Sequence, residues 1–416
     1  MVEKESKKIV SEKGEKKYKP DINKDNLFRL PWSKNDHGNG WLEITTFCNM
    51  ACPGCYKGCH IEGRPRSHFP LKEVKEDILH LKKVKNCQTV TISGGEPLMH
   101  PDIVEIVKFI KDNGMEPFIL TNGVLAKKPL LQKLKDNGLV GLEIRVDSLR
   151  INRKQTEEQL NELRKKHADT VNEVGGLFLG LTAVVGKQNL EEVGHIFEFG
   201  RKNPDKVNLI TLILMRQFFF SEKEKLDTSD WIDTEDLCKE RVRFDEKTHF
   251  SAFLGSHHED YRLRWLYAFW LNLDGETLGY LDGEAVRLAQ FMNHFKEGRY
   301  FYIRPKEKYY LSILSVFGIA IFNKSFRKML GRFFLKCLKN PKYFFKKASL
   351  QQFFILRPPG FVDGKRDVCD DCPCMTKGND GRLTPSCILD ECNFLGGNYR
   401  ELNDKELKEY KKKWGV

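Results

Sequence analysis

A repeating pattern of short apolar runs and longer amphipathic stretches fills residues 41–214 and restricts what this chain can fold into. The apolar runs are rich in β-branched and aromatic residues, as strands are, and lie at 41–46, 89–93, 117–121, 141–146, 177–185 and 207–214. The stretches between them carry apolar residues at helical spacing, at 71–84, 102–113, 127–137, 157–174 and 190–202. Strand–helix alternation of this kind predicts an α/β fold with a parallel sheet and right-handed crossovers.

A loop with three cysteines follows the first apolar run. Cys48, Cys52 and Cys55 stand at the spacing C-x3-C-x2-C, and Tyr56 comes directly after the third. Cysteine thiolates are the usual ligands of iron–sulfur clusters, so three of them on one short loop can bind one face of a cluster. A four-iron cluster needs four ligands, which leaves one iron open. The loop alone also allows a structural zinc site, or thiols packed as small apolar residues.

A second motif, Ser93-Gly94-Gly95-Glu96-Pro97, ends the second apolar run. Together the two motifs resemble the radical S-adenosylmethionine (SAM) superfamily, with its C-x3-C-x2-C signature and its Gly-Gly-Glu motif in the same order. The resemblance covers about residues 41–215. It implies a partial (β/α)6 TIM-type barrel.

The resemblance also implies cofactors and a reaction. Cys48, Cys52 and Cys55 would hold a [4Fe–4S] cluster, SAM would chelate its open iron, and Tyr56 matches the aromatic residue often found near the adenine. One electron, from a donor such as a ferredoxin or flavodoxin, would cleave SAM reductively to a 5′-deoxyadenosyl radical that abstracts hydrogen from a substrate. The cofactors carry this chemistry, and the protein supplies orientation and exclusion of water. No catalytic side chain beyond the cofactor ligands is indicated.

Further residues expected to bind SAM stand where predicted strands end. Gly94 and Gly95 allow close approach of the backbone to a ligand, and Glu96 supplies a carboxylate for the SAM ammonium group. Asn122 and Asp147 follow the third and fourth runs, and Asp147 is expected to accept a hydrogen bond from a ribose hydroxyl. Ligand sites in parallel α/β proteins collect at the carboxyl ends of strands, so we expect these residues to share one edge.

A second group of cysteines lies near the end of the chain. It reads C-x2-C-x-C followed by C-x4-C, and its members are Cys369, Cys372, Cys374, Cys387 and Cys392. Zinc or an iron–sulfur cluster would fit such a group. Its position is similar to that of the SPASM-type extension of radical SAM enzymes, although the spacing differs, which favours an auxiliary iron–sulfur cluster over zinc. A four-iron cluster takes at most four of the five, and either Cys374 or Cys392 is the spare. Cys59 lies outside both motifs and is interpreted as structural.

The excess positive charge is confined to one segment. The formal net charge of the chain is +12, and residues 304–357 contain 13 Lys/Arg, one acid and 12 Phe/Tyr. Such a local imbalance points to a partner-binding surface. Within it, residues 324–339 are amphipathic at helical spacing, with Phe326, Leu330, Phe333 and Cys337 on one face. This face could lie in an anionic membrane interface, or pack on the barrel and leave the basic face in water. Binding to nucleic acid, by stacking of aromatic residues on bases, is a third option, disfavoured because no nucleic-acid module is present.

The remaining organisation follows from composition. We expect a disordered charged tail (1–30), a core domain (31–215), a mostly helical accessory region (216–357) with a helix near 261–270, a cysteine-rich region (358–400) and a tail helix (401–416). Residues 257–260, His-His-Glu-Asp, are interpreted as a solvated loop rather than a metal site. No run of 18 apolar residues predicts a transmembrane helix. Clustered cysteines and the lack of a signal peptide favour the cytoplasm, at the membrane surface if the basic segment binds there.

Three hypotheses for function remain at this point. The basic, aromatic segment favours a radical SAM enzyme that acts on a lipid or isoprenoid at a membrane. The second cysteine group favours a radical SAM enzyme that modifies a peptide or protein. The third, an iron–sulfur electron carrier without SAM chemistry, is disfavoured by the Gly-Gly-Glu motif.

Overall fold

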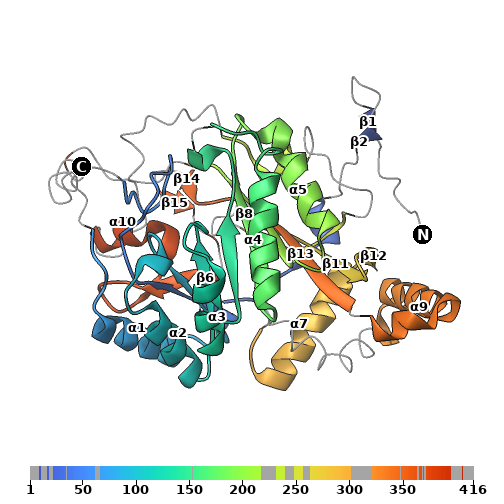
Figure 1. Ribbon diagram of the computed structural model, residues 1–416, viewed down its shortest axis with the longest axis horizontal. Coiled ribbons are helices and arrows are strands. Elements are labelled where there is room, and N and C mark those ends of the chain that lie inside the picture. Colours follow the sequence, from blue (N-terminus) through green and yellow to red (C-terminus); the bar gives the residue numbers. More distant parts are fainter. Residues whose placement is uncertain are drawn as a thin grey trace.

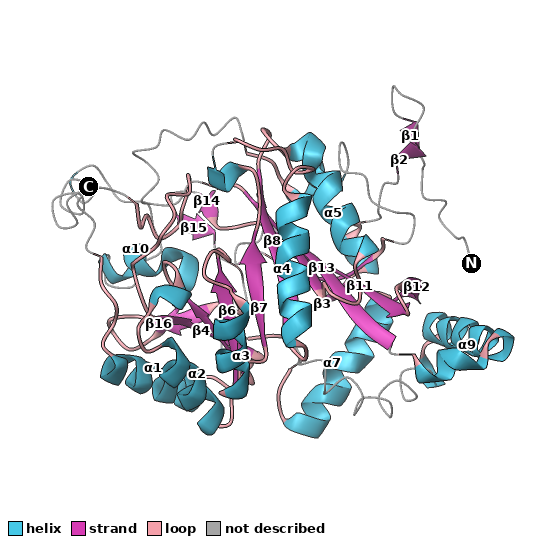
Figure 2. Ribbon diagram, viewed as in Figure 1, coloured by secondary structure: helices cyan, strands magenta, loops and turns pink. Residues whose placement is uncertain are grey.

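The computed structural model describes most of the chain (Figures 1 and 2). The described residues are 9–10, 16–17, 22–33, 35–60, 66–151, 153–216, 231–238, 248–255, 263–300, 321–346, 348–362, 365–367, 369, 372–394 and 405. The predictions for residues 257–260 and for most of the tail helix lie outside them.

Six parallel strands form one half of a large sheet, in the order of the sequence. They are β4 (Asn39–Glu43), β5 (Thr89–Ser93), β6 (Glu116–Thr121), β7 (Gly141–Arg145), β8 (Phe178–Val185) and β9 (Leu209–Leu214). Each pairs in parallel with the next, so every carboxyl end lies at the same edge. This confirms the predicted parallel sheet, and the strands that the structure describes do not close into a full barrel.

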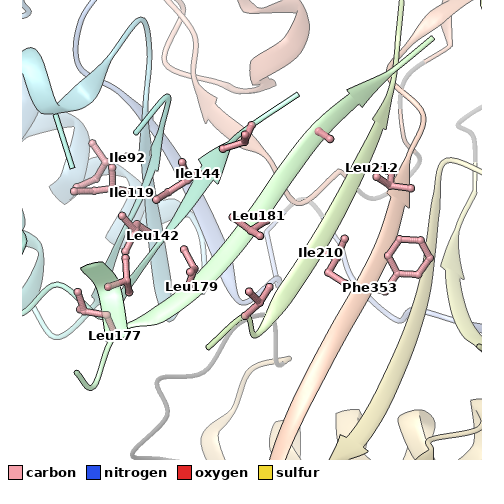
Figure 3. Packing of buried hydrophobic residues seen from close by; sticks show 14 of the residues in the cluster. Ile92, Ile119, Leu142, Ile144, Leu177, Leu179, Leu181, Ile210, Leu212 and Phe353 are labelled. Carbon is pink, nitrogen blue, oxygen red and sulfur yellow. The ribbon is translucent and has the colours of Figure 1, made fainter. Parts of the chain in front are cut away.

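Five helices connect these strands and cover one face of the sheet. They are α1 (Leu71–Val84), α2 (Ile103–Asp112), α3 (Lys128–Asp136), α4 (Asn161–Val174) and α5 (Val193–Lys202). Their apolar faces and alternate residues of the strands form one buried core, of which Ile119, Leu142, Leu181 and Ile210 are members (Figure 3). Because side chains alternate along a strand, the intervening residues face the opposite, concave side of the sheet.

The other half of the sheet comes from the region that the sequence predicts to be mostly helical. Its strands are β10 (Phe250–Leu254), β11 (Trp265–Leu273), β12 (Glu276–Tyr280) and β13 (Ala348–Leu356). Strand β13 pairs in parallel with β9, and β11 pairs antiparallel with β13. The helix expected near 261–270 is therefore wrong. That run is apolar on both sides because β11 is buried on both faces, and a continuous apolar run carries no clear period. Helices α6 (Thr234–Asp236), α7 (Gly283–Glu297) and α9 (Lys324–Lys339) accompany these strands.

A second core lies on the concave face of the sheet. It joins Trp265, Tyr267 and Phe354 of the sheet to residues of α7 and α9, and to Cys369 and Cys372 of the cysteine-rich segment. That segment contains β14 (Gly360–Val362), β15 (Lys365–Asp367), β16 (Met375–Lys377), β17 (Leu383–Pro385), the 3-10 helix η10 (Ser386–Ile388) and α10 (Leu389–Phe394). The second cysteine group is thus built onto the sheet and is not a detached appendage.

Helix α9 packs on the edge strand β12 with the face that was a candidate for a membrane interface. Phe326 and Cys337 are buried, and Leu330 and Phe333 are half-buried against the concave core. Arg332 donates to the carbonyl of Leu278 at 3.1 Å. The alternative in which this face packs on the barrel is confirmed. No helix among the described residues is long and apolar enough to cross a membrane.

The beginning of the chain is partly described. Strands β1 (Ile9–Val10) and β2 (Lys16–Lys17) pair with each other within the segment expected to be disordered, and most of the first 21 residues lie outside the described part. The 3-10 helix η1 (Lys24–Asn26) follows, and β3 (Phe28–Arg29) joins the far edge of the sheet beside β10. The ordered domain therefore begins before residue 30.

Candidate functional site

The three-cysteine loop leaves the carboxyl end of β4. Cys48, Cys52 and Cys55 are half-buried free thiols. Thr45 anchors the beginning of the loop, since its hydroxyl hydrogen-bonds with His68 Nδ1 at 2.9 Å and accepts from the Phe47 backbone N–H at 3.0 Å. These contacts hold three thiols on one short loop over the edge of the sheet.

The surroundings give the three thiols different acidities. Burial raises the pKa of Cys48 to about 11 and also raises the pKa of Cys52. A hydrogen bond from the Cys59 thiol lowers the pKa of Cys55, and the nearby guanidinium of Arg145 acts in the same direction. Cys59 is buried behind the loop, so it contacts the site although it lies outside the motif. A cation beside the loop favours thiolates, the form in which cysteine binds metal.

Gly94 and Gly95 let the end of β5 lie against the start of the cysteine loop. Gly94 has φ +130°, and a Cβ there would stand 2.4 Å from the carbonyl oxygen of Thr45. A Cβ on Gly95 would stand 2.0 Å from the carbonyl oxygen of Phe47. The backbone N–H groups of Gly95 and Glu96 donate to these two carbonyls at 2.8 and 2.7 Å. The close approach that the glycines allow in this structure is to the loop backbone, and contact with a ligand stays a prediction.

Glu96 is fully buried and joins the ends of three elements. Its Oε1 accepts from the Thr121 hydroxyl at 2.7 Å and from the Leu98 backbone N–H at 3.1 Å, and its Oε2 accepts from the Asn122 backbone N–H at 2.8 Å. Burial raises the pKa of Glu96, and these three donors oppose that shift. A carboxylate has about four acceptor positions. Among the described residues Oε2 meets one donor, which leaves it able to accept one more hydrogen bond.

Asn122 extends from the end of β6 to the cysteine loop. Its Nδ2 donates to Asn49 Oδ1 at 2.7 Å and lies 3.8 Å from Cys48 Sγ. This contact brings together two residues that the sequence predicts separately, one as a cofactor-binding residue and the other as a metal ligand. Tyr56 lies on the inner side of the loop, where its hydroxyl stands 3.2 Å from Ser93 Oγ and 3.4 Å from Glu43 Oε1.

Asp147, beyond the end of β7, is fully buried and engaged by protein groups. Its Oδ2 accepts from Arg145 Nε at 2.7 Å, and its Oδ1 accepts from the Arg150 backbone N–H at 2.9 Å. These contacts give the carboxylate of Asp147 a role in positioning its protein neighbours. The structure does not test the contact with a ribose hydroxyl, which stays a prediction. Arg145 is the more exposed partner, with 24% of its side chain accessible, and it lies near Cys52 and Cys55. Sequence reasoning missed Arg145, since a single arginine at a strand end belongs to no motif.

A buried ion pair supports the loop after β7. Glu157 and Arg164 pair with no exposed side-chain surface. Glu157 Oε1 accepts from the Ser148 backbone N–H at 2.7 Å, and Arg164 donates to the carbonyl of Val146 at 2.9 Å. This pair fixes the backbone on both sides of Asp147.

Lys57 connects the cysteine loop to the end of the chain. Its ammonium group lies 2.6 Å from Glu43 Oε2 and 2.9 Å from Asp390 Oδ2, and only 3% of its side chain is exposed. Asp390 belongs to α10, between Cys387 and Cys392. One buried cation therefore holds the first cysteine loop against the segment that carries the second cysteine group.

Four of the five C-terminal cysteines gather closely. Thiol hydrogen bonds join Cys372 to Cys369 and to Cys374, and Cys387 lies near enough to act on Cys372 electrostatically. Trp265 Nε1 donates to Cys369 Sγ at 3.2 Å. Cys392 packs with Ile388 and Cys387.

Within the described ranges, no three His, Cys, Asp or Glu side chains converge closely enough to hold one metal ion. Which metal or cluster the two groups of thiols bind stays a prediction.

An apolar row lies across the same edge of the sheet, opposite the cysteine loop. Val184 of β8 and Leu356 of β13 are both in register with Ile213 of β9. All three are half-buried, and their strand neighbours belong to the core on the helix side, so these three face the concave side. Trp265 stands in register with Leu356 and contacts Cys369. The row therefore ends beside the second cysteine group.

These features define a class of protein: an α/β enzyme with thiols, a buried carboxylate and an arginine at the carboxyl edge of a parallel sheet. Residues 42–200 match the Radical SAM superfamily. This part of the chain is therefore similar to radical SAM domains, and members of this superfamily use a [4Fe–4S] cluster and SAM.

Several individual proteins are similar to parts of the chain. A probable GTP 3′,8-cyclase from Methanococcus maripaludis (strain C7) is 39% identical over 111 residues, which cover 26% of this chain and 36% of the relative. An AdoMet-dependent heme synthase from Methanosarcina barkeri (strain Fusaro) is 26% identical over 165 residues, covering 38% and 46%. The chain thus spans about a third to a half of the length of these relatives. The crystal structure of Streptococcus suis SuiB bound to S-adenosylmethionine aligns with a TM-score of 0.37 at 18% identity, covering 51% of this chain and 44% of SuiB.

Proposed function

We propose that Cys48, Cys52 and Cys55 hold the SAM-cleaving [4Fe–4S] cluster of this enzyme. The observation that carries the proposal is the shared edge: the cysteine loop, Glu96, Asn122 and Arg145 come from four successive strand ends. The cluster, when bound and reduced, supplies the electron that cleaves SAM. Everything else at the site concerns how this chain binds and orients the cofactors.

We assign the remaining acceptor position of Glu96 Oε2 to the ammonium group of SAM. The carboxylate is held by three donors, so a fourth, charged donor meets a group that is already oriented. Arg145 is the matching partner for the SAM carboxylate, because its guanidinium is partly exposed while Asp147 fixes its direction. Asn122 would position the loop through Asn49 and lie beside the bound cofactor.

We propose that the C-terminal group binds a second, auxiliary cluster through Cys369, Cys372, Cys374 and Cys387. Support comes from the thiol contacts among the first three and from the electrostatic proximity of Cys387. Cys392 is then the spare. An auxiliary cluster beside the concave face would contact a substrate or pass an electron, and a ferredoxin or flavodoxin would supply electrons to the enzyme.

For the substrate, we propose a lipid or isoprenoid that lies against the apolar row. Val184, Ile213 and Leu356 give a contiguous apolar surface at the edge where SAM would be cleaved, and burying such a surface against hydrocarbon is worth about 25 cal/mol per Å2. An enzyme with this substrate would work at a membrane surface from the cytoplasmic side. A peptide substrate is the second candidate, favoured by the auxiliary cysteine group. Three half-buried aliphatic residues would then receive an apolar side chain of that peptide.

One experiment separates the substrate classes. The anaerobic enzyme with SAM and dithionite is incubated with either a total lipid extract or a peptide-rich aqueous extract, and 5′-deoxyadenosine is measured above the level without extract. The proposal predicts stimulation by the lipid extract alone, and loss of that stimulation in Ile213→Ser with the unstimulated rate retained. Stimulation by the aqueous extract alone would replace the lipid by a peptide or another soluble substrate. Absence of 5′-deoxyadenosine under every condition would instead contradict SAM cleavage itself.

A further inference from the structure

The outward side of α9 and of the 3-10 helix η9 (Pro341–Phe345) carries an unusual set of exposed apolar residues. Leu335 is 59% exposed, Leu338 76% and Phe345 89%, and Phe322, just before α9, is 74% exposed. None of them belongs to the face of α9 that packs on β12. In Figure 1, α9 projects at one end of the molecule, beyond the strand edge. An exposed apolar patch of this kind marks an interaction surface.

The same surface is strongly basic. Residues 321–346 contain eight Lys/Arg and no Asp or Glu. Lys336 pairs with Glu276, the first residue of β12, and Lys346 lies 3.0 Å from Asp274 in the turn between β11 and β12. The described residues provide no ion pair for five others, Lys324, Lys328, Arg332, Lys339 and Lys342. Of these, Lys324 and Lys328 lie on the exposed side of α9.

Helical spacing places charge and apolar surface on one stripe. Counting in steps of three or four from Lys324 gives Lys328, Gly331, Leu335 and Leu338, all of them exposed. The stripe is basic in its first half and apolar in its second. A basic region with adjacent large apolar side chains is the combination that anionic bilayers attract and then retain. A soluble acidic protein would pair with the lysines but would not explain the apolar half.

We infer that this stripe, Lys324–Lys328–Leu335–Leu338, together with the exposed Phe322 before α9 and Phe345 in η9, docks the enzyme on an anionic lipid bilayer. The inference deepens the proposed membrane location and rests on it, but it replaces the face expected from the sequence by the opposite one. Phe326, Leu330 and Phe333 hold α9 to the protein, and Leu335 and Leu338 enter the interface. Binding of this stripe to a bilayer does not require SAM cleavage, so vesicle binding and 5′-deoxyadenosine formation can be measured separately.

The test is co-sedimentation of the cofactor-loaded protein with vesicles of phosphatidylcholine alone or with 30% phosphatidylserine, at low and high salt. We expect binding to the anionic vesicles only, weakened by salt. Each engaged lysine contributes about a 5-fold increase in partitioning, so Lys324→Glu with Lys328→Glu should weaken binding by about 30-fold or more. Leu335→Ser with Leu338→Ser should also release the protein.

Matched controls lie on α1, near the opposite end of the molecule. Lys82→Glu with Lys83→Glu reverses two exposed lysines, and Leu79→Ser removes an apolar residue that is 46% exposed. Both should bind vesicles as the unaltered protein does. All variants should retain unstimulated 5′-deoxyadenosine formation, which shows that they are folded and keeps this test separate from that of the SAM site.

Three results would overturn the inference. The first is no binding to anionic vesicles, and the second is equal loss of binding in the α1 and α9 variants. The third is a concentration-dependent dimer in sedimentation velocity that Leu335→Ser with Leu338→Ser abolishes, since the stripe would then be a self-association surface.

Discussion

The replacement of Glu96 by Gln tests how the site would bind SAM. In the structure three donors converge on the Glu96 carboxylate, and one acceptor position of Oε2 is left for the SAM ammonium. A Gln side chain has one oxygen and one NH2 group, so in either orientation its NH2 group faces at least one of these donors. The substitution also removes the negative charge.

The magnitude follows from the lost charged hydrogen bond. Hydrogen bonds to charged groups contribute about 1.5–3 kcal/mol, which corresponds to a loss of about 10- to 150-fold in SAM affinity. Cluster content should not change, because no thiol is removed. The measurement is anaerobic calorimetric titration of the reconstituted protein with SAM, together with iron analysis.

Glu116→Gln is the matched control. Glu116 is also buried, at 4% exposure, but it lies at the amino end of β6, the edge away from the site, where Gln88 Nε2 donates to it at 3.2 Å. Its substitution should leave SAM affinity unchanged. Unchanged affinity in Glu96→Gln, or an equal loss in both variants, would refute the assignment of Glu96 as the ammonium partner.

Three further predictions follow from buried groups. Lys57→Met should destabilise the protein by about 3–5 kcal/mol, because it leaves the buried carboxylate of Glu43 without the Lys57 ammonium group. Adding Glu43→Gln should restore part of this loss. Chemical denaturation measures the stability of both variants, and no restoration in the double variant would contradict the argument. Burial lowers the pKa of His167 to about 4, so the folded state resists protonation and stability falls as the pH drops below about 6.5. His167→Gln should remove about 1.4 kcal/mol of the stability lost between pH 7.5 and pH 5.5, and an unchanged pH dependence would show that His167 is not responsible. Anaerobic reconstitution should give about eight irons per chain, about four in Cys387→Ala and about eight in Cys392→Ala, whereas zinc in the second group would contradict an auxiliary cluster.

The parallel half of the fold is predictable from the sequence because each strand–helix unit is local. The predicted strand 89–93 and helix 71–84 coincide with β5 and α1, where alternation and helical periodicity are strong. The second half is not predictable in the same way. The sequence of β11 resembles that of a buried helix because the strand is apolar on both faces. Strand β13 lies within a basic, aromatic segment whose charge does not indicate a strand. Both depend on pairing with strands far away in the sequence, which no local pattern records.

The residues of the candidate site show the same difference between what a local pattern predicts and what only folding reveals. Residues that belong to motifs, such as Cys48 and Glu96, were predicted to share an edge, and the structure places them there. Arg145 and Lys57 were missed, because a single cation has meaning only through partners such as Asp147 and Asp390 that folding brings to it. For Asp147 the position at a strand end was predicted, but the sequence did not predict that its carboxylate accepts hydrogen bonds from neighbouring arginines.

The central claim is that the loop of Cys48, Cys52 and Cys55 holds the cluster that cleaves SAM, and Cys52→Ala tests it most directly. The matched control is Cys87→Ala, which removes a buried thiol at the amino end of β5, the edge of the sheet away from the loop of Cys48, Cys52 and Cys55. After anaerobic reconstitution, both proteins are given SAM and dithionite, and iron and 5′-deoxyadenosine are measured. The account predicts that Cys52→Ala loses about four irons and all 5′-deoxyadenosine formation, while Cys87→Ala keeps both. Normal 5′-deoxyadenosine formation by Cys52→Ala would contradict it.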